Sequence, residues 1–596
     1  MFFDIMFTLI KKGYYMNICE LNIIKELFEN SYTNQRILSK NTKYSLGVVN
    51  KSLKNLFEYE FISKNNSLTL KAKSEIEKNR PKNAIILAAG LGFRMVPINF
   101  ETPKAMVEVK GEILIERIIR QLREVGVEKI YVLTGYMKEK FEYLIEEFNV
   151  ELVYNREYFE KNNIFSLKLV ADKLDNSYIV PSDIWCKDNP FSKVEMYSWY
   201  MVSDNLSKKS EVRVNRKNEL VRVGFDDAGN DMLGISYLLS KDCDYVREKI
   251  KNLCKYEKNN SLFWEKSLFS NKKMIVHSKL VNSKDAVEIN TYEQLRELDN
   301  NSNNLDTKQI KIISNTLSID SSKIKNISVL KKGMTNRSFL FEVDRQKYIM
   351  RVPGNGTKEL INRKEELDVY SKIKEKGISD DIIYINAENG YKITKYIDNA
   401  RCCDKDNKDD LKRCMKFLKI FHDMNLKVEH TFDIFKSIDF YETLRNGQKS
   451  VYKDYDSTKE KVKLLKNYIE NSEKRFCLCH IDANCDNFLF DKNDKIYLID
   501  WEYSAMQDPH LDIAMFCIYS LYDKKQIDDL IDIYFENNCK TEDRIKIYAY
   551  ISACGLLWSN WCEYKFQLGI EFGEYSVKQY HYAKEYFNIV NSYGVL

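Results

Sequence analysis

The strongest constraint on the fold of this chain is a short apolar run, residues 84–88, that ends directly in a glycine-rich turn. A run of this length that is apolar throughout is typical of a strand buried in a parallel sheet. Gly90 and Gly92 follow at its carboxyl end, which is the edge where open α/β sheets bind ligands. Glycines there let backbone N–H groups approach phosphate oxygens, so the segment predicts a nucleotide-binding α/β domain.

The residues after this turn form a longer signature. The chain reads L-A-A-G-x-G-x-R-M-x-P from Leu87, and Thr102-Pro-Lys104 follows. A cation such as Arg94 can neutralise a triphosphate. The combination resembles the start of the sugar-phosphate nucleotidylyltransferases, and within them the bacterial phosphocholine cytidylyltransferases, over most of residues 83–298.

This resemblance implies a Rossmann-like α/β/α sheet in which a phosphomonoester attacks the α-phosphorus of CTP and pyrophosphate leaves. The protein must mainly hold two polyanions in line and screen their charge. Arg94 and Lys104 would contact the reacting phosphates, Asp183 and Asn290 would hold Mg²⁺, and Trp264 would contact choline. The nucleotide-binding residues implied are Ala88, Ala89, Gly90, Gly92 and Arg94.

Two departures from the family pattern leave the substrate open. Asn290 stands where choline-type members usually carry Asp, and relatives that act on amino-sugar phosphates use Asn there as a metal ligand. The usual D-x-D near the first metal reads Pro181-Ser-Asp183, which leaves one carboxylate. We therefore expect metal binding to survive. A domain that only binds nucleotide is the alternative.

A second motif lies at residues 480–487, which fit the pattern H-x-D-x-x-x-x-N. This is the catalytic loop of protein kinases and their small-molecule relatives. Asp482 is expected to accept the proton of the substrate hydroxyl, and Asn487 to ligate Mg²⁺. Asp500 ends an apolar segment and is expected to supply a second Mg²⁺ carboxylate. The pattern predicts phosphoryl transfer from ATP.

The sequence upstream agrees with this motif. Residues 332–339 resemble a nucleotide-covering loop, and Arg351 lies on the next predicted strand, where most kinases carry Lys but choline and ethanolamine kinases commonly carry Arg. Residues 326–596 resemble the bacterial choline kinases, which share the fold of the aminoglycoside phosphotransferases. The resemblance implies a bilobal, protein-kinase-like domain that binds ATP through Asn336, Arg351 and Glu366. Glu366 is the expected ion-pair partner of Arg351, and Glu365 is the competing choice.

Aromatic residues near the carboxyl terminus suggest what this domain binds. Trp558 and Trp561 are three residues apart on a predicted helix, and Tyr575 follows. Aromatic rings attract a quaternary ammonium group through cation–π interaction, although a W-x-x-W pair alone is also typical of a helix core. The resemblance adds Glu502 and Tyr503 to the choline site, and it gives Asp508 and Asp512 the role of orienting the catalytic loop.

Together these resemblances imply a bifunctional transferase that makes CDP-choline for the decoration of cell-surface polymers. The second domain would phosphorylate choline with ATP, and the first would couple phosphocholine to CTP, with Mg²⁺ as the cofactor of both. One alternative is a matching pair of enzymes for ethanolamine or a sugar. Another is a DNA-binding regulator whose enzyme-like domains only sense choline or nucleotide.

The first eighty residues carry the excess positive charge of the chain. The whole chain has a formal charge of +5, and residues 1–80 contain 13 Lys and Arg against 8 Asp and Glu. Two predicted helices, residues 33–40 and 45–57, precede two short predicted strands, an order that resembles a winged helix-turn-helix. Val48, Leu53 and Phe57 are expected to face inward. DNA is the predicted partner of residues 17–80, and a docking or dimerisation module is the alternative.

The predicted domains are residues 1–80, 82–300 and 308–596, joined after the second by a polar linker at 299–306 in which nothing can be buried. Fourteen cysteines without a regular spacing indicate reduced thiols. No apolar run approaches the roughly 20 residues of a membrane span. We therefore expect a cytoplasmic protein without membrane contact, with Met16 as an alternative first residue.

Overall fold

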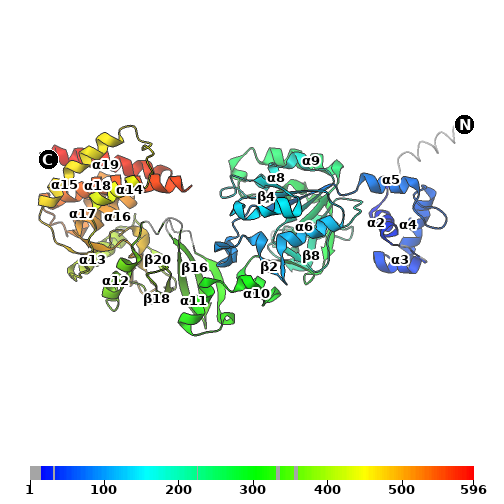
Figure 1. Ribbon diagram of the computed structural model, residues 1–596, viewed down its shortest axis with the longest axis horizontal. Helices are drawn as coiled ribbons and strands as arrows, with labels where there is room; N and C mark the ends of the chain where they lie inside the picture. The colour runs from blue at the N-terminus through cyan, green and yellow to red at the C-terminus, as the bar shows by residue number, and fades with distance from the viewer. Residues whose placement is uncertain are drawn as a thin grey trace. The chain divides into compact units, whose positions relative to one another are not determined.

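The computed structural model describes residues 15–30, 32, 34–224, 226–330, 336–354, 357 and 360–596, and at Asn336 it describes only the backbone. The chain divides into two compact units, Met1–Lys311 and Ile312–Leu596. The first contains the N-terminal helices and the α/β domain, and the second contains the kinase-like domain (Figure 1). Among the described residues, no helix is both long and apolar enough to cross a bilayer.

The N-terminal segment is helical. Its helices are α2 (Ile18–Glu29), α3 (Gln35–Thr42), α4 (Leu46–Glu58) and α5 (Leu70–Lys78). The two predicted strands are reduced to one antiparallel bridge between Ile62 and Leu68. The chain turns helical directly afterwards because the Thr69 side chain caps α5. The winged helix therefore stays a prediction.

The buried face of α4 differs from the expected one. Val49, Leu53 and Leu56 are buried, whereas Val48 and Phe57 are exposed. The buried residues follow the spacing i, i+4, i+7 that one helix face requires, and they pack in the same core as α2. The prediction that Val48 and Phe57 face inward is wrong. The face of α4 that contacts the core is narrow, and Val49, Leu53 and Leu56 occupy it.

The α2 helix fixes these helices to the α/β domain. Lys25 forms an ion pair with the buried Glu195 at 3.0 Å, and the Tyr197 hydroxyl donates to Asn22 Oδ1 at 3.1 Å. Val194 is fully buried in the core formed by α2, α3, α4 and α5. The N-terminal helices and the α/β domain thus share a core, which agrees with their forming one compact unit.

The α/β domain is built on a ten-stranded mixed sheet with the order β5-β4-β1-β6-β11-β8-β13-β10-β9, and β12 pairs with β13. The central strand β1 is parallel to both of its neighbours, as predicted. The strands are β1 Asn83–Ala88, β4 Lys129–Thr134, β5 Glu151–Tyr154, β6 Ser177–Pro181, β8 Trp199–Ser207, β9 Val212–Val214, β10 Glu219–Arg222, β11 Gly229–Leu238, β12 Phe269–Ser270 and β13 Lys273–Val281.

Helices cover both faces of this sheet, which confirms the α/β/α arrangement (Figure 1). Successive residues of β1 alternate between two cores, with Ile86 on one face and Ile85 on the other. The first core contains Ile119 of α6, and the second contains Phe165 of α8. The helices are α6 Leu114–Glu124, α7 Tyr143–Phe148, α8 Asn163–Lys168, α9 Ser240–Leu253 and α10 Tyr292–Leu298.

The polar stretch after α10 is bound to the α/β domain. Asp299 Oδ2 accepts a hydrogen bond from the Lys110 N–H at 2.6 Å, and the buried Ser302 donates to the Glu108 carbonyl at 2.7 Å. These partners lie at the hairpin of β2 (Glu108–Val109) and β3 (Glu112–Ile113). The expectation that nothing in this stretch can be buried is wrong, because its polar side chains satisfy backbone groups of the hairpin. Along the sequence, the boundary between the two compact units falls after this stretch, within α11 (Lys308–Leu317).

The amino-terminal lobe of the kinase-like domain is a five-stranded sheet with the order β15-β16-β17-β19-β18 and the helix α12. The strands run antiparallel to their neighbours, and α12 lies in the connection between β17 and β18. Their bounds, with that of the helix, are β15 Lys325–Val329, β16 Asn336–Val343, β17 Gln346–Pro353, α12 Arg363–Ile373, β18 Ile382–Ile385 and β19 Lys392–Lys395.

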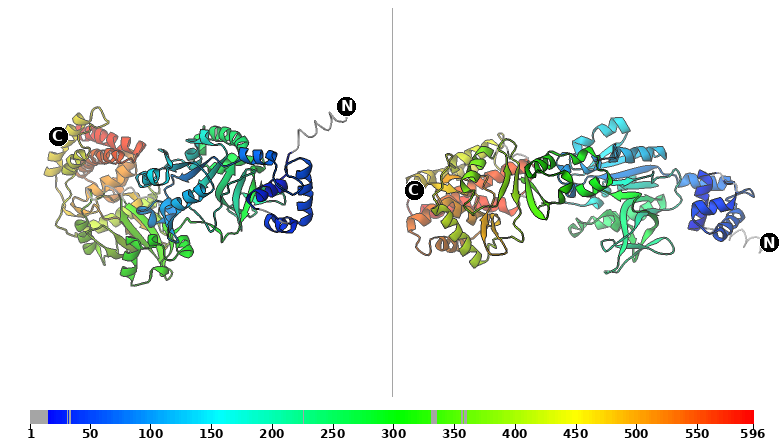
Figure 2. Two further views of the ribbon diagram at one scale, coloured as in Figure 1. Left: turned by 45° about the vertical axis from the view of Figure 1, so that its right-hand side comes forward. Right: turned by 90° about the horizontal axis from the view of Figure 1, so that it is seen from below.

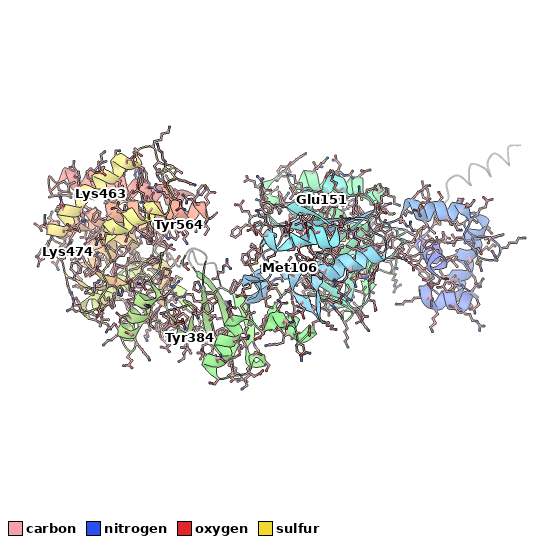
Figure 3. All side chains as sticks on the ribbon, in the orientation of Figure 1. Met106, Glu151, Tyr384, Lys463, Lys474 and Tyr564 are labelled. Atoms are coloured by element: carbon pink, nitrogen blue, oxygen red, sulfur yellow. The ribbon has the colours of Figure 1, made fainter. Side chains whose placement is uncertain are left out.

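The carboxyl-terminal lobe is mostly helical (Figure 2). Its long helix α18 is buried along most of its length, and Tyr564, labelled in Figure 3, lies near its end. The helices are α13 Lys408–Asp423, α14 Ile434–Thr443, α15 Tyr455–Asn471, α16 His510–Tyr519, α17 Lys524–Tyr534, α18 Thr541–Gln567 and α19 Glu574–Ser592. The strands are β20 Arg401–Cys402, β21 Cys477–Cys479, β22 Phe488–Phe490, β23 Ile496–Leu498 and β24 Ala505–Gln507.

Candidate active sites

The glycine-rich turn and the neighbouring strand ends line a cavity of about 590 Å³ in the α/β domain. Gly92 has a φ of +60°, and a Cβ atom there would lie 3.2 Å from the Lys104 Cβ. Glycine is therefore favoured at this position by both backbone conformation and space. The predicted residues that line the cavity are Ala88, Ala89, Gly90, Gly92, Arg94, Lys104, Asp183 and Asn290.

The predicted cations contact the predicted metal ligands. The Lys104 ammonium forms an ion pair with Asp183 and donates to Asn290 Oδ1 at 2.7 Å. Arg94 Nη2 donates to the same oxygen at 2.6 Å. Asp183 Oδ1 is buried and has no hydrogen-bond partner among the described residues. A carboxylate oxygen without a partner, next to an amide oxygen, is a donor set that suits Mg²⁺.

Glu288 adds a second carboxylate that the sequence did not point to. The strands β7 (Ile184–Cys186) and β14 (Ala286–Glu288) pair, with Glu288 opposite Ile184, and the Ile289 N–H donates to the Asp183 carbonyl at 2.9 Å. Burial raises the pKa of Glu288, and the charge of Asp183 raises it further. The motif Pro181-Ser-Asp183 carries one carboxylate, as the sequence indicates, and strand pairing brings Glu288 near it.

Trp264 does not line the cavity, which corrects its prediction as a choline-binding residue. Its side chain is fully buried in the core, with its ring centre 6.2 Å from that of Tyr200. The preceding residue, Phe263, lines the cavity together with Tyr158 and Phe159. Adjacent side chains point in different directions as the chain enters a 3₁₀ turn at Trp264, so the one-residue offset decides which ring is accessible.

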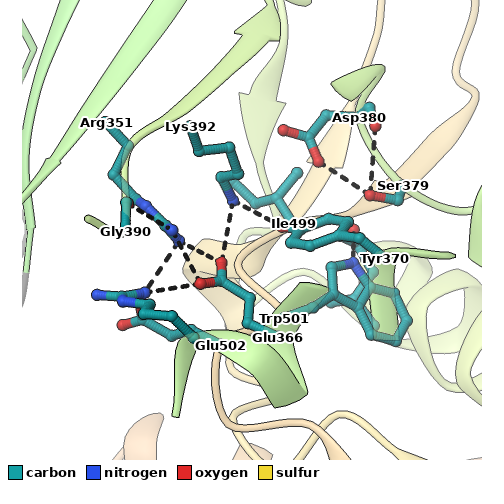
Figure 4. A network of polar contacts seen from close by, with 12 residues as sticks. Arg351, Glu366, Tyr370, Ser379, Asp380, Gly390, Lys392, Ile499, Trp501 and Glu502 are labelled. Atoms are coloured by element: carbon teal, nitrogen blue, oxygen red, sulfur yellow. Dashed lines mark hydrogen bonds and ion pairs between the residues drawn. The ribbon is translucent and has the colours of Figure 1, made fainter. Parts of the chain in front are cut away.

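In the kinase-like domain the predicted ion pair forms. Arg351 on β17 contacts both carboxylate oxygens of Glu366 on α12, with 2.9 Å between Nη2 and Oε2 (Figure 4). Glu365 instead accepts a hydrogen bond from the Asn362 side chain at 2.8 Å. Burial alone would raise the pKa of Glu366, but the Arg351 guanidinium lowers it to about 2. Glu366 is therefore the ion-pair partner of Arg351, and Glu365 does not take this role.

A second carboxylate extends this network and corrects another prediction. Glu502 was expected at the choline site, but its Oε2 lies 3.0 Å from Arg363 Nη1 and 3.6 Å from Arg351 Nη1. Arg363 also lies 2.8 Å from Glu366, so the two glutamates share it. Glu502 thus ties α12 to the segment that follows the catalytic loop. No local pattern pointed to Arg363, because this partner lies far away in the sequence.

Replacing Glu366 by Gln is expected to destabilise the kinase-like unit by about 3–5 kcal/mol, because buried Arg351 and Arg363 would share Glu502 as their remaining counter-charge. The measurement is the unfolding midpoint of this unit in calorimetry, since a chain with two units need not unfold in one step. The matched control is Glu365→Gln, which should change the free energy of unfolding by less than about 0.5 kcal/mol. Equal shifts in the two variants would contradict the assigned pair.

The catalytic loop holds its predicted residues together. The Asn487 side chain donates to the Asp482 carbonyl at 2.9 Å, and the Asn484 side chain donates to Asp482 Oδ1 at 3.0 Å. The Ile499 N–H donates to the Asn487 carbonyl at 3.0 Å, which brings Asp500 to the loop. Burial raises the pKa of Asp482 to about 8 and that of Asp500 to about 7, with smaller contributions from neighbouring carboxylates. Buried carboxylates that oppose each other's ionisation favour a divalent cation.

Of the two aspartates expected to orient this loop, one does so. Asp512 accepts hydrogen bonds from the backbone N–H groups of His480 at 2.8 Å and Ile481 at 2.7 Å. Asp508 instead forms a buried ion pair with Lys546 of α18 at 2.8 Å. Asp508 therefore anchors α18, and its predicted contact with the loop is wrong.

The predicted aromatic residues gather in one cluster. The ring centres of Trp558 and Trp561 are 5.3 Å apart, and that of Tyr503 is 6.0 Å from Trp558. Burial raises the pKa of Tyr575, and the charge of Asp482 contributes, so this phenol lies near the predicted base. Trp558 and Trp561 are buried, so the structure places a packed aromatic cluster, called the aromatic wall below, in the region of the base.

Two further rings complete this wall. Phe572 lies 4.9 Å from Trp561 between ring centres, and Tyr519 lies 6.1 Å from Tyr575. Tyr519 comes from α16, and its hydroxyl donates to Asp486 Oδ2 at 2.8 Å. The sequence did not single out either ring, because each reaches the cluster through packing of separate helices.

Part of the predicted nucleotide-covering loop lies outside the described residues. These exclude residues 331–335 and the side chain of Asn336. The backbone of Asn336 begins β16 and pairs with Pro353. The contact of Asn336 with ATP therefore stays a prediction.

The fold and the two sites define a nucleotidyltransferase and a small-molecule kinase in one chain. Residues 84–189 match the MobA-like NTP transferase domain, and residues 327–582 match the choline/ethanolamine kinase family. A choline-phosphate cytidylyltransferase of Streptococcus pneumoniae is 31% identical over 230 residues, which cover 36% of this chain and 96% of that protein. The chain belongs to the choline-phosphate cytidylyltransferase family, and it carries a choline/ethanolamine kinase domain as well.

Two other relatives bear on the substrates. A 2-aminoethylphosphonate cytidylyltransferase of Lancefieldella rimae is 35% identical over 192 residues, which cover 31% of this chain and 77% of that protein. Protein LicA of Haemophilus influenzae is 26% identical over 259 residues, which cover 41% of this chain and 96% of that protein. The first matches the transferase domain, so similarity in this domain extends beyond choline-phosphate enzymes.

Proposed function

We propose that this protein makes CDP-choline from choline, ATP and CTP in two consecutive reactions. The observation that carries the proposal is the aromatic wall of Trp558, Trp561 and Tyr575 near Asp482. Rings attract a quaternary ammonium by about 0.5–2 kcal/mol each. A cation held against these rings would lie in the region of the base that accepts the hydroxyl proton.

In the kinase domain, the choline oxygen would attack the γ-phosphorus of ATP while Asp482 accepts the hydroxyl proton. The bond between the γ-phosphorus and its bridging oxygen breaks, and ADP leaves. Asn484 and Asn487 hold the Asp482 carboxylate in place through hydrogen bonds. Arg351, held by Glu366, supplies positive charge for the ATP phosphates.

In the transferase domain, a phosphate oxygen of phosphocholine would attack the α-phosphorus of CTP, and pyrophosphate would leave. Lys104 and Arg94 supply positive charge at the cavity. Because Gly90 and Gly92 have no side chains, the triphosphate can approach their backbone N–H groups closely. The product of the kinase is the substrate of this reaction. The activated choline would then serve the decoration of cell-surface polymers.

Both reactions would use Mg²⁺, which screens phosphate charge and orients the oxygens when bound. The residues that fit it are Asp183, Glu288 and Asn290 in the transferase domain, and Asn487 and Asp500 in the kinase domain. The site of action would be the cytoplasm, where both nucleoside triphosphates are available.

The test is to incubate the full chain with choline, ATP, CTP and Mg²⁺ and to follow the products by mass spectrometry. CDP-choline, ADP and pyrophosphate are the expected products. Omission of CTP should stop the sequence at phosphocholine, and EDTA should stop both steps. Phosphocholine without CDP-choline in the complete mixture would refute the transferase half. Absence of both phosphocholine and CDP-choline would refute the kinase half.

An amino-alkyl substrate is the second candidate, because Asn290 departs from the choline-type pattern and the transferase domain also resembles a 2-aminoethylphosphonate enzyme. Trp561→Ala distinguishes the two. If choline is the substrate, this change should raise its KM about 3–30-fold through loss of a cation–π contact, and it should affect ethanolamine less. Faster turnover of ethanolamine than of choline by the unaltered protein would favour the second candidate.

A further inference from the structure

The helices α3 and α4 present a strongly basic surface that neither transferase reaction uses. Its members are exposed, and the segment 35–58 that carries them contains a single acidic residue, Glu58. Glu58 lies 3.8 Å from one of these cations, Lys54. We call this surface the basic face. It consists of Arg36, Lys40, Lys43, Lys51 and Lys54.

The basic face is separate from the contacts that fix the N-terminal helices to the α/β domain. Those contacts come from α2, through Lys25, Asn22 and Glu29, and from the end of α5, where the carbonyls of Lys78 and Asn79 accept hydrogen bonds from the α/β domain. The two family matches begin at residues 84 and 327, so the basic face lies outside both. This segment therefore adds something to the chain beyond the two enzymatic domains.

The first turn of α4 is shaped for close approach to a partner. Leu46 and Val48 are exposed there, Asn50 is exposed at the start of the second turn, and a Cβ atom on Gly47 would have nothing within 4 Å. The helix begins after a tight turn in which Lys43 has a φ of +57°, and Leu38 of α3 and Val49 of α4 are buried in the same core. An α-helix is about 10–12 Å across with its side chains, which matches the width of about 12 Å of the DNA major groove.

We propose that the basic face binds double-helical DNA, with the first turn of α4 in the major groove and the cations on the flanking phosphates. Charge complementarity supports this partner, because a duplex carries one negative charge per roughly 1.7 Å of its axis. The exposed Asn50 could contact base edges, and Leu46 or Val48 could contact thymine methyl groups. Single strands are usually bound on exposed aromatic platforms instead. The proposal is independent of the substrate of either enzyme.

The test measures binding of the full chain to a fluorescent random-sequence duplex of about 30 base pairs by anisotropy, at salt concentrations from about 50 to 200 mM. Five phosphate contacts predict a slope of about −4 to −5 in log K against log [salt]. Lys51→Glu with Lys54→Glu should weaken binding at least about tenfold and reduce the slope by about 2. Arg36→Ala with Lys40→Ala should act in the same direction.

The control is Lys208→Glu with Lys209→Glu, two exposed lysines of the α/β domain that change the net charge equally. An equal loss of binding in this variant would overturn the proposal, since bulk charge would then explain it. Tighter binding to a single-stranded RNA of the same length, or to phosphatidylserine vesicles, would also overturn it. The helical circular-dichroism signal and the thermal unfolding midpoints should be unchanged in each variant, which shows that the chain is folded.

Discussion

Asp482→Asn is expected to lower choline phosphorylation by about 10²–10⁴-fold, because an amide cannot accept the proton of the attacking hydroxyl. The change is nearly isosteric, and the contacts from Asn484 and Asn487 can partly persist. Cytidylyl transfer to supplied phosphocholine should be unaffected, since Asp482 lies in the other compact unit. The measurement compares ADP release with pyrophosphate release in the same preparation.

Asp494→Asn is the matched control for this prediction. Asp494 is an exposed residue of the same lobe that contacts Arg413, so it removes an equal charge outside the catalytic loop. Its kinase activity should stay within about twofold of the unaltered protein. If Asp482→Asn kept more than a tenth of the kinase activity, Asp482 would not be the base. A sensor that does not catalyse would show no kinase activity in either protein.

Lys104→Ala is expected to lower cytidylyl transfer by about 10²–10³-fold, because it removes a fixed cation from a site that must hold two polyanions. Lys104 also contacts Asp183 and Asn290, so its loss leaves the carboxylates of Asp183 and Glu288 with less compensation. Phosphocholine should then accumulate from choline and ATP while CDP-choline does not. The ratio of these two products is the measured quantity.

Lys129→Ala serves as the control for the transferase. Lys129 is exposed at the first residue of β4, the end of the strand opposite to the ligand-binding edge. This variant should form CDP-choline at the normal rate. A comparable loss in both lysine variants would mean that general charge, rather than the position of Lys104, sustains the reaction. Normal transfer in Lys104→Ala would remove Lys104 from the reacting phosphates.

The sequence predicted the transferase fold well because its signals are local. The apolar run of β1 and the glycines after it lie within ten residues, and the backbone geometry follows from them. Glu288 and Phe263 were not predicted, because their positions depend on strand register and on the direction of a single side chain. The sequence pattern located the correct segment but selected Trp264 as the cavity residue, whereas the neighbouring Phe263 lines the cavity.

In the kinase domain the same distinction holds. The loop that carries Asp482 and Asn487 is fixed by spacing within one segment, so the sequence identified it. The roles of Glu502 and Asp508 were wrong, because Arg363 and Lys546 compete for these carboxylates from distant elements. A buried carboxylate takes the nearest cation, and only packing decides which cation is nearest.

The sequence by itself determined the two enzymatic folds, the glycine-rich turn, the catalytic loop and the excess charge of the first eighty residues, because each is a property of neighbouring residues. Tertiary structure confirmed Glu366 as the partner of Arg351, and it alone decided that Glu288 joins Asp183 and that Trp264 is buried. It also decided which face of α4 is exposed. These outcomes depend on which distant side chains share a buried volume, and burial makes the pairing of charges and the packing of rings obligatory.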